Sequence, residues 1–165
     1  MSLKIGVVAD THVPSTYVKI PDELWRDLDG CDQLVHAGDF DSWETYQEFK
    51  QRFPTTAVLG NRDTFQVCEE VPEWRILEAA GFRIGVVHGF GPPKNLGHRL
   101  RKAWPGGPVD LLVYGHSHQA GVEEIEGMRL LNPGSPTDTL CATRRTFAIL
   151  TLNDSIEIEI RDLES

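Results

Sequence analysis

The sequence has few cysteines, a shortage of basic side chains and no long hydrophobic run. Its 165 residues include three cysteines, which are far apart and form none of the paired spacings of zinc ribbons or redox sites. We therefore exclude a disulfide-stabilised miniprotein and expect reduced thiols in the core. The longest early apolar stretch, residues 5–9, is far too short to span a membrane, and no signal-peptide core precedes it. These absences predict a cytoplasmic protein that does not bind a membrane.

Acidic side chains outnumber basic ones, 25 to 16, which gives a net charge of −9 at pH 7 with neutral histidines. Such a surface repels a nucleic-acid backbone and releases few counterions from it, so nucleic acid is disfavoured as a partner. The content of 40% hydrophobic and 25% charged residues is ordinary for a globular protein. The length suits one hydrophobic core. We predict a single domain over residues 1–165.

Short apolar runs alternate with helix-like segments in the first half of the chain. We expect strands at residues 3–9, 34–37 and 55–59, and helices at 21–28 and 42–49. This alternation predicts right-handed crossovers and parallel strands. The first of these runs, Leu3–Ala9, is apolar almost throughout, which is typical of a strand covered on both faces.

The second half favours antiparallel pairing. It predicts a hairpin over residues 74–87, a helix at 96–104, a strand at 109–114, and further hairpins within 121–131 and 147–160. Together the two halves predict an α/β fold with two mixed sheets.

Five polar clusters fall where the expected strands end. They are Asp10-Thr11-His12, Gly38-Asp39, Gly60-Asn61-Arg62-Asp63, His88-Gly89 and Gly115-His116-Ser117-His118. Their leading polar residues are 22 to 29 positions apart, about the length of one strand with its connection. Because ligands collect beyond the carboxyl ends of strands in open α/β sheets, the clusters can converge on one crevice.

The clusters carry more metal-binding groups than one ion can use. The donors are four imidazoles, two carboxylates and one amide oxygen, from His12, His88, His116, His118, Asp10, Asp39 and Asn61. This exceeds a single tetrahedral site and suits two divalent ions about 3.5–4 Å apart. The nitrogen donors disfavour Mg²⁺ and Ca²⁺ and favour Mn²⁺, Fe²⁺, Co²⁺, Ni²⁺ or Zn²⁺. Paired ions activate water and clamp the oxygens of an in-line displacement, which indicates phosphoester hydrolysis.

Most clusters, taken singly, also have a structural interpretation. Asp10 can cap a turn, the pairs before Asp39 and Asn61 are common in turns, and His88 can be a buried strand-end histidine. The pair His116 and His118 favours metal, because alternate residues of an extended segment point the same way.

Two histidines lie outside the clusters. We expect His36 to be a core residue and His98, which is surrounded by basic residues, to lie on a solvated helix face.

With these residues in order, and with Asn132-Pro133-Gly134-Ser135 near the end, the chain resembles the calcineurin-like metallophosphoesterase superfamily. The resemblance is greatest to its small single-domain branch of YfcE-type phosphodiesterases and spans nearly the whole chain. It implies a four-layer α/β/β/α sandwich of two mixed sheets flanked by helices, with the metals at one end. It also implies that a metal-bridging hydroxide attacks a small phosphodiester or phosphate-ester substrate. Among the five candidate ions, manganese is our first expectation.

The resemblance implies a role for each donor. One ion would bind Asp10, His12 and His118, which we name the first donor set. The other would bind Asn61, His88 and His116, the second donor set, and Asp39 would bridge the two ions. The catalytic residues implied or expected are Asp39, Asn61, Arg62 and Asp63, and of these Asn61 and Arg62 would bind the substrate.

One pair of positions departs from the pattern of the superfamily's protein phosphatases. There, a histidine after the Gly-Asn pair is partnered by an aspartate and helps to protonate the leaving group; here the two positions hold Arg62 and Ser42. An arginine, with a pKa above about 12, donates no useful proton but can bind a non-bridging phosphate oxygen. Asp63 either positions Arg62 or caps the next turn. We therefore expect phosphodiesters with good leaving groups to be preferred over protein phosphomonoesters.

Other functions remain open at this stage. The same branch contains the retromer scaffold subunit, so the alternative is a retromer-like protein-interaction scaffold with little or no catalysis. Nuclease action is a further alternative, against which the low basic content argues. The sequence leaves a homo-oligomer open.

Overall fold

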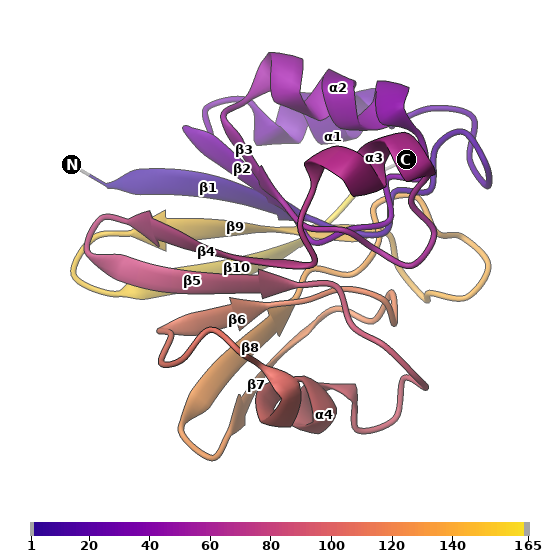
Figure 1. Ribbon diagram of the computed structural model, residues 1–165. Coiled ribbons are helices and arrows are strands. Elements are labelled where there is room, and N and C mark those ends of the chain that lie inside the picture. Colours follow the sequence, from indigo (N-terminus) through magenta and orange to yellow (C-terminus); the bar gives the residue numbers. More distant parts are fainter. Residues whose placement is uncertain (1, 164–165) are drawn as a thin grey trace.

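The computed structural model describes residues 2–163 as two five-stranded sheets packed against each other (Figure 1). The first sheet has the order β10-β9-β1-β2-β3. Its strands are β1 (Leu3–Val8), β2 (Gln33–His36), β3 (Thr55–Ala57), β9 (Thr146–Leu152) and β10 (Ile156–Asp162). Strands β1, β2 and β3 are parallel, and β9 pairs antiparallel with both β1 and β10. The expected parallel N-terminal strands are thus confirmed.

The second sheet has the order β4-β5-β6-β8-β7. Its strands are β4 (Trp74–Ala79), β5 (Phe82–Val87), β6 (Leu111–Val113), β7 (Gly121–Ile125) and β8 (Met128–Asn132). The central strands β5, β6 and β8 are parallel, while β4 and β7 pair antiparallel at the edges. Both sheets are therefore mixed, as expected.

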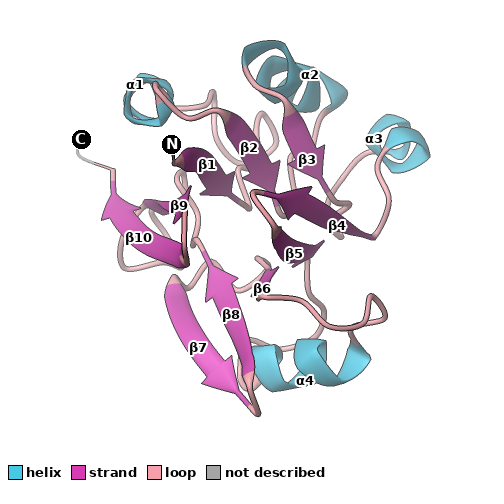
Figure 2. Ribbon diagram, turned by 90° about the vertical axis from the view of Figure 1, so that its left-hand side faces the viewer, coloured by secondary structure: helices cyan, strands magenta, loops and turns pink. Residues whose placement is uncertain are grey.

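Helices cover the two outer faces of the sheets (Figure 2). Helices α1 (Asp22–Leu28), α2 (Trp43–Arg52) and α3 (Phe65–Glu70) lie over the first sheet, and α4 (Leu96–Ala103) lies over the second. This is the predicted α/β/β/α arrangement. Helix α3 was not predicted, because six residues are too few to show an amphipathic period and only Val67 is buried.

Three apolar layers hold the sandwich together. Ile5, Val86 and Leu150 belong to the layer between the sheets. A second layer lies between the first sheet and its helices, and a third lies under α4. Strand β1 contributes to two layers, since Val7 belongs to the inter-sheet core and Val8 to the helix-side core. Burial on both faces explains why this strand is apolar almost throughout.

The expectation for the cysteines was half right. All three thiols are free, but Cys68 and Cys141 are exposed and Cys31 is half-buried, so the prediction of core thiols is wrong. Cys68 lies on a short helix that buries only Val67, and Cys141 lies in the loop after β8. Within residues 2–163, no helix is long and apolar enough to cross a membrane.

Candidate metal centre

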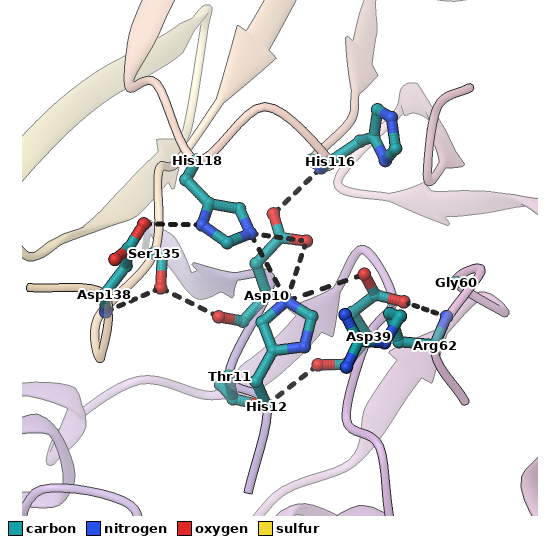
Figure 3. Close-up of polar contacts among 12 residues, drawn as sticks. Asp10, Thr11, His12, Asp39, Gly60, Arg62, His116, His118, Ser135 and Asp138 are labelled. Carbon is teal, nitrogen blue, oxygen red and sulfur yellow. Dashed lines mark hydrogen bonds and ion pairs between the residues drawn. The ribbon is translucent and has the colours of Figure 1, made fainter. Parts of the chain in front are cut away.

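The side chains singled out in the sequence meet where the parallel strands end, on the right in Figure 1 (close-up in Figure 3). Asp10 and His12 follow β1, Asp39 follows β2, His88 follows β5 directly, and His118 follows β6. The Nε2 atom of His88 lies 3.1 Å from Asp39 Oδ2. The Nε2 atoms of His12 and His118, 106 positions apart, lie 3.3 Å from each other.

The backbone at this edge is unusual. Five of the seven donor residues have positive φ angles between 49° and 74°: Asp10, His12, Asp39, His116 and His118. Such angles cost non-glycine residues about 1–3 kcal/mol each and cluster at functional sites. The residues after these strands therefore adopt backbone conformations that their intrinsic φ preferences do not favour, and the surrounding fold must hold them there.

The first donor set has the dimensions of an ion site. Asp10 Oδ1 lies 3.8 Å from His12 Nε2 and 3.6 Å from His118 Nε2. With the 3.3 Å between the two histidine atoms, the three atoms share a point about 2.1 Å from each, which is close to metal–nitrogen distances of about 2.0–2.1 Å. Asp10 Oδ1 is buried and makes no hydrogen bond among the described residues.

The second donor set is joined through Asn61. Its Oδ1 atom lies 3.0 Å from His88 Nε2 and 3.3 Å from His116 Nδ1. Asp39 lies between the two sets, because its Oδ2 atom is 3.1 Å from His88 Nε2 and 3.6 Å from His12 Nε2. Its carboxylate can reach ions in both.

Each of the four histidines has one ring nitrogen facing an oxygen outside the donor sets. The contacts are His12 Nδ1 to Asp41 (2.9 Å), His88 Nδ1 to the carbonyl of Ala37 (2.7 Å), His116 Nε2 to the carbonyl of Gly91 (2.8 Å) and His118 Nδ1 to Asp138 (2.7 Å). An N–H donating there leaves the other nitrogen as a lone-pair donor facing the site. Metal-binding histidines are oriented in this way.

Burial and charge set the protonation of the metal-free centre. Burial lowers the pKa of His88, but the carboxylates of Asp39 and Asp10 outweigh it and raise the pKa to about 9. Burial alone would raise the pKa of Asp39, but the hydrogen bond to His88 holds it below its usual range. Burial also raises the pKa of Asp10. A metal ion that binds His88 must therefore displace a proton.

Asp63 connects two loops of the site. Its carboxylate accepts the backbone N–H groups of Asp39 (3.1 Å), Asp41 (2.9 Å) and Gly60 (2.7 Å). These bonds go to residues that precede Asp63 in the chain, so they match neither of its two expected roles, the positioning of Arg62 or the capping of the next turn. The backbone N–H of Arg62 donates to Asp39 Oδ1 at 2.8 Å, and the Arg62 side chain is exposed.

The residues set apart from the clusters behave as expected. His36 is fully buried, stacks on Phe40 at 3.6 Å between ring centroids and accepts the Gly38 N–H. Burial lowers its pKa well below the usual value, so it is a neutral core histidine. His98 is exposed. Ser42 caps α2 by accepting the Thr45 N–H at 3.1 Å.

Sequence reasoning missed two carboxylates, Asp41 and Asp138, which receive the bonds from His12 and His118. Asp41 could have been noticed as a second acid two positions after Asp39. No spacing rule connects Asp138 to His118. Ser135, in the Asn-Pro-Gly-Ser motif, supports this region structurally, because its hydroxyl donates to the Asp10 carbonyl at 2.8 Å and accepts the Asp138 N–H at 3.0 Å.

The family model of the calcineurin-like phosphoesterase superfamily domain matches residues 3–155. The chain belongs to this superfamily. A probable metallophosphoesterase of Methanothermobacter thermautotrophicus is 37% identical over 133 residues, covering 81% of this chain and 77% of the relative. A phosphodiesterase of Methanocaldococcus jannaschii is 26% identical over 146 residues, covering 80% and 83%.

Solved structures give the same fold. A Thermotoga maritima protein superposes with a TM-score of 0.76 at 29% identity, covering 98% of this chain and 99% of that one. Wild-type Vps29 of Entamoeba histolytica, complexed with Zn²⁺, superposes with a TM-score of 0.72 at 24% identity, covering 98% and 100%. The superfamily and the clustered ligand side chains support divalent metal binding and a hydrolase.

Proposed function

We propose that residues 1–165 form one metallophosphoesterase domain that hydrolyses small phosphodiesters with the help of two divalent transition-metal ions. One observation carries this proposal: Asp10 Oδ1 is buried without a hydrogen bond among the described residues and lies 3.6–3.8 Å from the Nε2 atoms of three histidines, namely His12, His88 and His118. A buried carboxylate oxygen without a partner is costly. A divalent ion among these atoms removes that cost, so the residues fit the ion.

The two donor sets divide the work of holding the ions. Asp10, His12 and His118 would hold one ion and Asn61, His88 and His116 the other, with Asp39 shared. When bound, the pair supplies an activated water and a positive clamp for phosphate oxygens. The mixed nitrogen and oxygen donors favour Mn²⁺, Fe²⁺, Zn²⁺, Ni²⁺ or Co²⁺, and of these Mn²⁺ is the ion that we propose first.

Arg62 and Asn61 are the proposed substrate contacts. Both are exposed beside the buried donors, and the Arg62 guanidinium makes no hydrogen bond or ion pair with another described residue. It is therefore available to bind a non-bridging phosphate oxygen. Ser42 is occupied as a helix cap and offers no aspartate-like partner. We therefore propose phosphodiesters with good leaving groups as substrates, since the two positions that hold an acid pair in the superfamily's protein phosphatases are Arg62 and Ser42 here.

A retromer-like scaffold is the second candidate, because Vps29 proteins share this fold. Because Vps29 of Entamoeba histolytica was itself solved with Zn²⁺, metal binding alone does not separate the two candidates. All seven donor side chains for two ions are present here, and Arg62 is exposed beside them. We therefore favour catalysis. Action in the cytoplasm stays a prediction.

The decisive experiment compares the full chain with its Asp39→Asn variant. With Mn²⁺, we expect the wild type to hydrolyse aryl phosphodiesters or cyclic nucleotides faster than phosphoserine peptides, and Asp39→Asn to abolish this activity. The matched control is Asp110→Asn, which changes an exposed aspartate directly before β6 in the second sheet. A wild type that is inactive on the whole panel, whether or not it binds Mn²⁺, would support the scaffold.

A further inference from the structure

The two donor sets differ in the groups that contact the histidine ring nitrogens turned away from the ion site. Both histidines of the first donor set meet buried carboxylates: His12 faces Asp41 at 2.9 Å and His118 faces Asp138 at 2.7 Å. Both histidines of the second donor set donate to backbone carbonyls instead. Figure 3 shows Asp138 beside His118, on the side away from Asp10.

The two carboxylates are fixed in place. Asp138 is 2% exposed, and its Oδ1 atom accepts the Tyr17 hydroxyl at 2.9 Å and the Leu140 and Cys141 N–H groups at 2.8 and 3.0 Å. Asp41 is 4% exposed and accepts the Ser15 hydroxyl. Neither carboxylate can turn away from its histidine without breaking these bonds.

A carboxylate behind a histidine fixes the tautomer and makes the metal-facing nitrogen a stronger donor. The first donor set also contains the carboxylate of Asp10, whereas the second contains the neutral amide of Asn61. Because Asp39 is shared, it does not distinguish them. The negative charge around the first position therefore exceeds that around the second.

Resting on the proposed function, we propose that Asp41 and Asp138 are positioning residues that make the first donor set the tighter of the two ion sites. The first ion then binds at lower metal concentration, and the second completes the centre only when metal is more abundant. Activity consequently depends on how fully the second donor set is occupied.

The test titrates the metal-free full chain with Mn²⁺ by calorimetry and repeats the titration with Co²⁺, following its visible absorption bands. We expect two classes of site in the wild type. Asp138→Asn and Asp41→Asn should each weaken the tighter class by about 10–100-fold, change the Co²⁺ band that appears first, and leave the weaker class unchanged. The matched control, Asp110→Asn, removes a carboxylate that accepts the Arg83 backbone N–H near the starts of β5 and β6, at the opposite end of these strands from the site. It should change neither class.

The outcomes separate the two proposals. Equal affinities in the wild type, or variants that weaken both classes alike or neither, would overturn the positioning role while leaving a dimetal enzyme intact. A wild type that binds no divalent ion would overturn the proposed function itself. If Asp138→Asn does not fold, Asp41→Asn decides the matter, because it lies in a different loop and reports on His12.

Discussion

Replacing Gly60 by alanine should disrupt the metal centre through a single added methyl group. A Cβ atom built on Gly60 lies 2.8 Å from Asp39 Cγ and closer still to the Oδ1 and backbone nitrogen of Asp39. Gly60 is not among the residues with positive φ, so the backbone itself accepts alanine and only the contact with Asp39 opposes it.

Asp39 cannot move aside cheaply. Its Oδ1 atom accepts the Arg62 N–H at 2.8 Å, its Oδ2 atom lies 3.1 Å from His88 Nε2, and its backbone N–H is held by Asp63. Overpacking of this kind costs about 1–3 kcal/mol. For a chain of this size, each kcal/mol lowers Tm by about 2–4 °C, so we expect a fall of roughly 2–12 °C together with weaker Mn²⁺ binding, since Asp39 serves both donor sets.

Calorimetric melting with and without Mn²⁺ measures both effects. Gly121→Ala is the matched control, because a Cβ there meets nothing within 4 Å and φ is ordinary. It should stabilise the protein slightly, by up to about 1 kcal/mol. If Gly60→Ala melts like the wild type and keeps the full Mn²⁺-induced shift, the contact with Asp39 does not oppose the added methyl group.

Three further outcomes follow from the same contacts. Since the pKa of His88 is raised to about 9 in the metal-free protein, the imidazole is protonated at pH 7, and Mn²⁺ binding should release that proton. The apparent affinity for Mn²⁺ should then rise about tenfold per pH unit up to pH 9. Calorimetric titrations at several pH values, in buffers of different ionisation enthalpy, measure the affinity and the released proton. An affinity that does not change with pH contradicts the prediction. Saturating Mn²⁺ at a hundred times Kd should stabilise the protein by about 2.7 kcal/mol per ion, and a chelator should reverse the rise in Tm; equal Tm values with and without chelator would contradict ion binding. Ser135→Ala removes the buried hydrogen bonds to the Asp10 carbonyl and the Asp138 N–H. The free energy of unfolding, measured in urea, should fall by about 1–3 kcal/mol. An unchanged midpoint would show that the motif serine does not support this loop.

The order of the helices and strands and the types of metal-binding side chain could both be predicted from the amino-acid sequence. Nearly continuous apolar runs such as Leu3–Val8, interrupted only by Lys4, predict strands covered on both faces, because a strand between two layers has no solvent-facing side. Donor residues at the ends of these runs are predicted to lie together at one edge of the sheet, because parallel strands bring their carboxyl ends together. Residue type also limits the choice of metal, since imidazole and carboxylate preferences are properties of the side chains.

The partners that orient those donor side chains depend on contacts between distant parts of the folded chain. The contact of His12 with Asp41 spans 29 positions and that of His118 with Asp138 spans 20, and no local period relates such pairs. Whether Asp63 holds an arginine or three backbone N–H groups likewise depends on which loops meet. Helix α3 escaped prediction because a six-residue helix owes its stability to packing rather than propensity. Local pattern specifies secondary structure and chemistry, whereas ring orientation, protonation and the difference between the two donor sets arise from partners brought together by folding.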